Sequence, residues 1–154
     1  MNKILTFEEL DRLAEKLADF SSENTVIALI GDLGTGKTTF SQKFAKALGV
    51  KEQIKSPTFN YVLEYLSGKL PLYHFDVYRL GEAEEIYEIG YEDYLNSDGV
   101  LLIEWANIIE SELPKKYIEI KINYHTENTR EVELQYIGDE MKDKEMLEYV
   151  GFSH

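Results

Sequence analysis

The chain has 154 residues, no cysteine and a net charge of -13. This length suits a single domain over residues 1–154, and the lack of cysteine excludes disulfides, thiolate zinc sites and cysteine nucleophiles. So acidic a surface argues against tight nucleic-acid binding by the chain alone. No segment resembles a membrane span or a signal peptide, and we therefore expect a cytoplasmic protein without membrane contact.

The N-terminal third predicts a helix, a buried strand and a second helix. Over residues 6–20 the apolar side chains recur at helical spacing, and Thr6 with Glu9 forms a capping box. The continuous apolar run 25–30 is typical of a strand buried on both faces. A glycine-rich turn follows, and a helix begins near Lys37, with Gly49 at the position of its C-terminal cap.

The middle of the chain predicts three strands and short helices. We expect strands over 58–66 and 72–80, with Tyr73, Phe75 and Val77 on one face of the second strand and with His74, Asp76 and Tyr78 on the other. Residues 81–95 are acidic and aromatic and predict one or two short helices. The apolar run 100–103 predicts a buried strand that ends at Glu104.

The last forty residues predict a hairpin and a helix. Residues 118–124 and 132–136 alternate apolar and polar side chains, which is typical of an antiparallel edge hairpin with one wet face. Residues 138–154 predict a short charged helix and a loose end.

Residues Gly31-Asp32-Leu33-Gly34-Thr35-Gly36-Lys37-Thr38 match the phosphate-binding P-loop motif at every fixed position, between a strand and a helix as that motif requires. Its glycines let backbone N–H groups surround phosphates, and the helix N-terminus adds a positive dipole. We expect Lys37 to reach the β and γ phosphates of a nucleoside triphosphate and the Thr38 hydroxyl to ligate Mg²⁺.

Two acids are candidates for the magnesium shell and the hydrolytic step. Glu104 follows four apolar residues, so its strand delivers a carboxylate to the edge of the sheet where ligands bind. Asp76 is a second candidate, although a structural pair with His74 or Arg79 is an alternative. The segment 56–59, Ser-Pro-Thr-Phe, stands where many P-loop proteins carry a switch, and it is also a common turn at the start of a strand.

Two further residues keep alternative interpretations. Trp105 is the only tryptophan. It either packs in the core or an interface or lies beside the nucleotide. Thr6 is fully explained as a helix cap.

Five segments together resemble the TsaE (YjeE) family, small P-loop ATPases of bacterial tRNA threonylcarbamoyladenosine biosynthesis. The resemblance extends over residues 6–110 and rests on 31–39, Gly-Asp-Leu-Gly-Thr-Gly-Lys-Thr-Thr; 56–59, Ser-Pro-Thr-Phe; 74–80, His-Phe-Asp-Val-Tyr-Arg-Leu; 88–90, Glu-Ile-Gly; and 103–105, Ile-Glu-Trp.

The resemblance implies a three-layer α/β P-loop NTPase fold, with a mostly parallel central sheet and antiparallel additions. It also implies slow, Mg²⁺-dependent ATP hydrolysis in support of a TsaB–TsaD assembly that modifies adenosine 37 of tRNA. Lys37, Glu104 and Asp76 would be catalytic, and Thr38, Glu104 and Asp76 would hold the metal. The implied nucleotide contacts are Asp32, Leu33, Gly34, Thr35, Gly36, Lys37, Thr38 and Thr39, with Thr6 beside the adenine and Trp105 reporting on the site.

Two other functions stay open at this stage. A small metabolite kinase usually has several arginines on a lid, whereas this chain has only Arg12, Arg79 and Arg130, and none of them lies in an arginine-rich segment. A nucleotide-loaded binding module with incidental hydrolysis is the other alternative. For the partner, the acidic, tyrosine-bearing stretch 82–94 is the candidate docking surface, unless it is a solvated helix with its apolar side chains packed inward.

Overall fold

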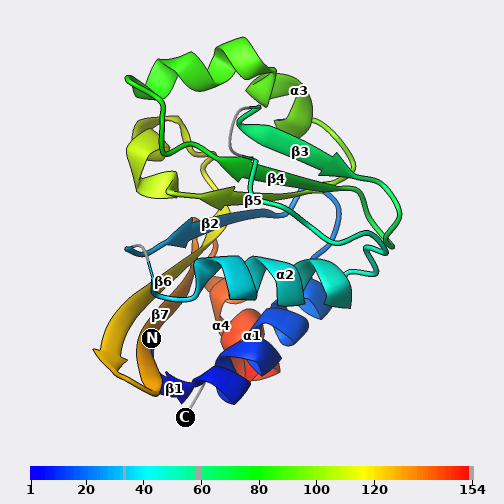
Figure 1. Ribbon diagram of the computed structural model, residues 1–154. Coiled ribbons are helices and arrows are strands. Elements are labelled where there is room, and N and C mark those ends of the chain that lie inside the picture. The colour runs from blue at the N-terminus through cyan, green and yellow to red at the C-terminus, as the bar shows by residue number, and fades with distance from the viewer. Residues whose placement is uncertain (33, 58–59, 153–154) are drawn as a thin grey trace.

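A computed structural model of the chain describes residues 1–32, 34–57 and 60–152. Its strands are β1 (Asn2–Thr6), β2 (Val26–Ile30), β3 (Val62–Tyr65), β4 (Leu72–Asp76), β5 (Val100–Glu104), β6 (Tyr117–Thr126) and β7 (Thr129–Ile137). They form one seven-stranded sheet in the order β1-β7-β6-β2-β5-β4-β3 (Figure 1). The four strands β4, β5, β2 and β6 run parallel, while β3, β7 and β1 join in antiparallel fashion.

Helices cover both faces of this sheet (Figure 1). One face is covered by α1 (Phe7–Phe20), α2 (Lys37–Ala47) and α4 (Glu140–Val150); the other by the 3₁₀ helices η1 (Ala83–Ile89) and η2 (Ala106–Glu112) and by the short α3 (Tyr91–Leu95). The three-layer α/β fold expected from the sequence is therefore confirmed. Within the described residues, every helix is too short or too polar to cross a bilayer.

The expected hairpin forms, but its predicted place at the edge of the sheet is wrong. Strand β6 pairs in parallel with β2, and β7 pairs with β1, so the edge on this side belongs to β1. The sequence did not predict β1, because its two apolar residues, Ile4 and Leu5, are adjacent and give no alternation to recognise; only Leu5 is buried.

Strand β4 is shorter than expected and ends at Asp76 instead of Leu80. The Asp76 carboxylate accepts a hydrogen bond from the backbone N–H of Tyr78 at 3.0 Å. Such a contact two residues ahead turns the chain out of the strand. The expected strand over 58–66 appears as β3 from Val62 to Tyr65, and its predicted first residues, 58 and 59, lie outside the described residues.

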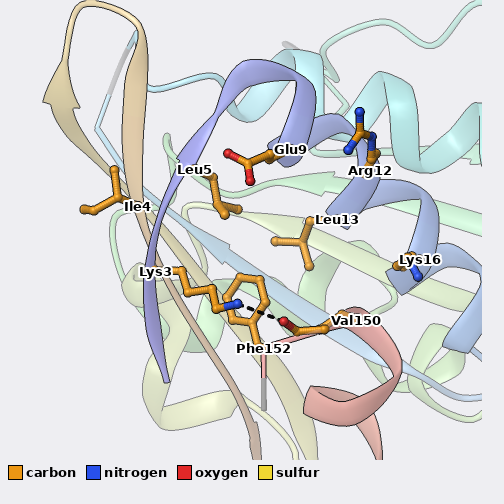
Figure 2. A pocket seen from close by; sticks show the side chains of 10 residues that line it. Lys3, Ile4, Leu5, Glu9, Arg12, Leu13, Lys16, Val150 and Phe152 are labelled. Carbon is orange, nitrogen blue, oxygen red and sulfur yellow. Dashed lines mark hydrogen bonds between the residues drawn. The ribbon is translucent and has the colours of Figure 1, made fainter. Parts of the chain in front are cut away.

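The C-terminal helix forms as expected, but the chain after it is not loose as far as Phe152. Gly151 ends α4 with a φ of 80°, and Phe152 is 3% exposed. Figure 2 shows Lys3 reaching from β1 across a cavity of about 340 Å³, where its ammonium donates to the carbonyl oxygen of Gly151 at 2.8 Å. The two ends of the described chain are thus packed together, at a cavity that contains none of the predicted catalytic or metal-binding residues.

Candidate functional site

The glycine-rich segment forms a loop between β2 and α2, as the motif predicts. Gly36 stands at the N-terminal cap of α2 with a φ of 106°, and Gly34 has a φ of 80°. Both values lie in the left-handed region that only glycine adopts without strain. Leu33, also predicted to contact the nucleotide, lies outside the described residues.

Lys37 is buried in the first turn of α2, with 6% of its surface exposed. Its ammonium nitrogen has no hydrogen-bond partner among the described residues and lies 3.5 Å from the centre of the Trp105 ring. Burial lowers the pKa of Lys37, and the carboxylates of Glu104, Asp76 and Asp32 oppose that shift. Burial of a cation without a hydrogen-bonding partner costs free energy of folding. Such an arrangement is expected where the side chain is placed to bind an anionic ligand.

A cavity of about 340 Å³ opens in front of this lysine. Residues 31–38 are called the phosphate loop, after the motif that they match. The cavity is lined by residues of this loop, of the start of α2, of the 56–59 segment and of the ends of β4 and β5: Gly34, Gly36, Lys37, Thr38, Thr39, Ser56, Asp76, Glu104 and Trp105. Asp76 and Glu104 are direct neighbours across the parallel β4–β5 pair. The predicted catalytic and metal-binding residues therefore line one cavity. Thr58 and Phe59 lie outside the described residues.

Glu104 is held in place by two side chains that the sequence did not assign to the site. Its Oε2 atom lies 2.5 Å from His74 Nε2 and accepts a hydrogen bond from Ser41 Oγ at 3.3 Å. Ser41 follows Lys37 by four positions, so α2 presents both on the same face. The four-residue spacing of Lys37 and Ser41, and the shared strand face of His74 and Asp76, are the sequence signals that could have indicated these two contacts.

Asp76 lines the same cavity and has a carboxyl group with a perturbed pKa. Burial raises its pKa, and the hydrogen bond from the Tyr78 N–H opposes this rise. The structural His74 pair considered for Asp76 is not what forms, because Nε2 of His74 is directed to Glu104. Two carboxyl groups at the same strand ends suit the oxygen coordination that Mg²⁺ prefers.

Trp105 lines the cavity, whereas Thr6 caps helix α1. Trp105 has a φ of 61°, lines the cavity and packs its ring 4.7 Å from that of Tyr78, so it is both a packing residue and a wall of the site. The Thr6 hydroxyl accepts from the Glu9 N–H, which confirms the capping box.

A second cavity of about 270 Å³ adjoins the loop. Its lining is largely apolar: Phe7, Leu10, Asp11, Gly36, Thr39 and Phe40. Gly36 and Thr39 also line the cavity at Lys37, so the two spaces meet at the start of α2. Phe7 follows Thr6 directly, and the sequence did not single it out.

Arg130, from the start of β7, also contacts the loop, although the last forty residues contain no recognised motif. Its Nε donates to the carbonyl oxygen of Thr35 at 3.2 Å, and its Nη2 donates to that of Gly34 at 3.4 Å. A lone arginine in a hairpin gives no signal in the sequence, because this contact joins positions more than ninety residues apart.

Known proteins resemble this chain over most of its length. The family described as "Threonylcarbamoyl adenosine biosynthesis protein TsaE" matches residues 4–132. Two proteins named "tRNA threonylcarbamoyladenosine biosynthesis protein TsaE" are similar: that of Bacillus subtilis (strain 168), 39% identical over 149 residues, 96% of this chain and 93% of that protein, and that of Rickettsia felis, 42% identical over 124 residues, 80% and 72% respectively.

A solved structure agrees with these matches. The crystal structure of Bacillus subtilis YdiB superposes with a TM-score of 0.75 and 34% sequence identity, covering 98% of this chain and 96% of that one. Similarity in sequence and in structure extends from β1 through the phosphate loop to the hairpin, and the chain therefore belongs to the TsaE family.

Proposed function

We propose that the chain binds ATP with Mg²⁺, hydrolyses it slowly by itself, and supports threonylcarbamoyladenosine modification of tRNA in the cytoplasm together with a TsaB–TsaD assembly. Membership of the TsaE family supports the pathway. The geometry of the cavity supports the chemistry.

The single observation that carries the nucleotide assignment is the buried ammonium of Lys37. It faces a cavity that glycines and the start of α2 also line, and it has no hydrogen-bond partner among the described residues. A triphosphate provides the negative charge and the acceptors that this ammonium needs, and the N-terminus of α2 adds further N–H donors.

The oxygen atoms around the cavity fit a magnesium ion. The Thr38 hydroxyl and the carboxylates of Glu104 and Asp76 would hold it, directly or through water. When bound, Mg²⁺ neutralises charge on the β and γ oxygens of the triphosphate. Glu104, fixed by His74 and Ser41 through Oε2, is left with Oε1 to orient or deprotonate the attacking water.

The neighbouring cavity suits the adenine base. Its apolar walls include Phe7, Leu10 and Phe40, and it opens beside the phosphate loop at Gly36. Aromatic and aliphatic walls favour a flat heterocycle. In this arrangement Thr6 acts by starting α1, which places Phe7 at the cavity, while its hydroxyl stays bonded to Glu9.

The positions of two of the three arginines, Arg130 and Arg12, argue against the kinase alternative. Phosphoryl transfer to a metabolite uses arginines aimed at the moving phosphoryl group. Arg130 lies near the loop but donates to backbone carbonyls, and Arg12 lines the separate cavity of Figure 2. The binding-module alternative differs from the proposal only in whether turnover responds to partners.

The deciding experiment measures ATP binding by calorimetry and steady-state phosphate release for the purified chain, alone and with a TsaB–TsaD pair. We expect measurable binding, slow turnover of the isolated chain, and stimulation by the assembly, since unassisted P-loop hydrolysis can be slower than the assisted reaction by about 10³ or more. Failure to bind ATP would end the nucleotide proposal. Fast turnover that ignores every partner would end the accessory role.

A further inference from the structure

Arg130 is 7% exposed, so its charge is largely removed from water. Within the described part of the chain, its hydrogen bonds all run to backbone carbonyl oxygens: Nε to Thr35 (3.2 Å), Nη2 to Gly34 (3.4 Å), and Nη1 to Thr126 and Thr129 (2.8 Å each). These bonds use four of the five guanidinium N–H donors, and a buried guanidinium needs such acceptors to offset the loss of hydration. The forked guanidinium group of Arg130 thus joins the end of the β6–β7 hairpin to the phosphate loop.

The same guanidinium lies over two aromatic rings. Its central carbon is 4.9 Å from the ring centre of Phe7 and 4.9 Å from that of Tyr124. Phe7 is also a wall of the cavity beside Gly36 and Thr39. Arg130 therefore contacts the phosphate loop through hydrogen bonds and a wall of the second cavity through the Phe7 ring.

Peptide geometry links these contacts to phosphate binding. A trans peptide is planar, and its N–H points opposite to its C=O. Holding the Thr35 carbonyl toward Arg130 therefore directs the N–H of Gly36 the other way, and Gly36 lines the cavity at Lys37. The loop carbonyls need donors on their outer side if the N–H groups are to face an anion, and Arg130 supplies them.

We propose that Arg130 is a positioning residue, which fixes the phosphate loop in its anion-binding conformation and couples that conformation to the base cavity through Phe7. The inference rests on the proposed nucleotide site. Arg130 acts in this role through the backbone of the loop, because four of its five N–H donors are used on carbonyl oxygens.

The first test compares Arg130→Met with the parent chain for binding of MgATP and of inorganic tripolyphosphate with Mg²⁺, by calorimetry. Loss of the fork removes charged hydrogen bonds to the loop, so we expect both ligands to bind about tenfold or more weakly. Arg12→Met is the matched control and leaves both affinities unchanged. Native affinity in a folded Arg130→Met variant would overturn the inference, whereas a parent chain that binds neither ligand would overturn the proposed function instead.

The second test isolates the coupling. Tripolyphosphate has no base, so an effect of Phe7→Leu on its binding does not come from a contact with adenine and must act through the protein. We expect Phe7→Leu to weaken tripolyphosphate binding about threefold in the parent chain and to have no effect in the Arg130→Met background. Equal effects in both backgrounds would remove the coupling. If Arg130→Met does not fold, Arg130→Lys takes its place: it keeps the charge but not the fork, and unchanged affinities in this variant would refute the positioning role.

Discussion

The ammonium of Lys37, at the start of α2, lies 3.5 Å from the centre of the ring of Trp105, which directly follows β5. A cation over an indole face is attracted to the electron density of the ring. This cation–π contact stabilises an ammonium that has no hydrogen-bond partner within the described residues. Binding of a triphosphate would draw Lys37 from the ring toward phosphate, which makes Trp105 a natural fluorescent reporter.

Replacement of Lys37 by alanine should weaken MgATP binding and abolish hydrolysis, because the buried charge at the cavity would be lost. The measurements are calorimetric affinity, phosphate release and Trp105 emission on titration with MgATP. Lys46→Ala, an exposed lysine on the last turn of α2, is the control and should behave as the parent. Normal binding and hydrolysis by Lys37→Ala would contradict the phosphate-loop assignment.

Replacement of Glu104 by glutamine should leave MgATP binding nearly intact and slow hydrolysis by at least about tenfold, the size expected on loss of one proton-positioning or electrostatic contribution. Single-turnover phosphate release gives the chemical step directly. Glu119→Gln changes another buried glutamate, on β6, and should not alter the rate. An unchanged rate in Glu104→Gln would transfer the essential role to Asp76.

Replacement of Asp76 by asparagine should stabilise the fold while it slows hydrolysis. Burial raises the pKa of Asp76, so the folded protein binds this proton more readily than the unfolded chain, and the associated stability is lost as the pH rises through the raised pKa. At pH 7 we expect the variant to melt about 2–4 °C higher, and the difference to shrink toward about pH 4, near the ordinary pKa of aspartate.

Thermal unfolding across this pH range, with Asp98→Asn as an exposed control, checks the sign. A variant that melts lower than the parent at pH 7 would show that the Asp76 carboxylate stabilises the fold instead.

The acidic face over η1 and α3 is the proposed docking surface for the TsaB–TsaD assembly. Residues 82–95 contain six acidic residues and no lysine or arginine. Ile86 and Tyr91 are buried beneath them, as the alternative interpretation expected, while Tyr87 stays 44% exposed. Glu85 accepts a hydrogen bond from the Glu82 N–H, so reversing it would also disturb the start of η1.

Reversal of the exposed residues Glu84, Glu88 and Glu92 to lysine should therefore weaken docking and leave ATP binding intact. Docking of the parent should require ATP and weaken as salt rises. Surface plasmon resonance against immobilised TsaB–TsaD measures both effects. The isolated chain should show no detectable tRNA binding at physiological salt, and either tight tRNA binding or normal docking of the triple variant would contradict this account.

Local signals in the sequence sufficed for the phosphate loop, for the buried strands β2 and β5, and for the place of Glu104 at a strand end, because each depends on a contiguous run of residues. The contacts that hold the site together could not be predicted in this way. His74 on β4 contacts Glu104 on the adjacent strand β5, and Arg130 on β7 contacts Thr35, which lies 95 residues earlier in the chain. Such pairs appear only when the strand order is known, and the position of β6 beside β2 was itself not predicted.

The strand order also determines when the site can exist during synthesis. Strand β2 emerges early, but its neighbours β5 and β6 follow some seventy and ninety residues later. The loop after β2 approaches β6 so closely that a Cβ on Gly31 would lie 2.5 Å from the carbonyl oxygen of Ile122. We therefore expect the loop to lack its β6 contacts in a nascent chain until the hairpin has left the ribosome, because contacts this distant in sequence form slowly. If the proposed nucleotide site is correct, incomplete chains should bind ATP more weakly than the full chain.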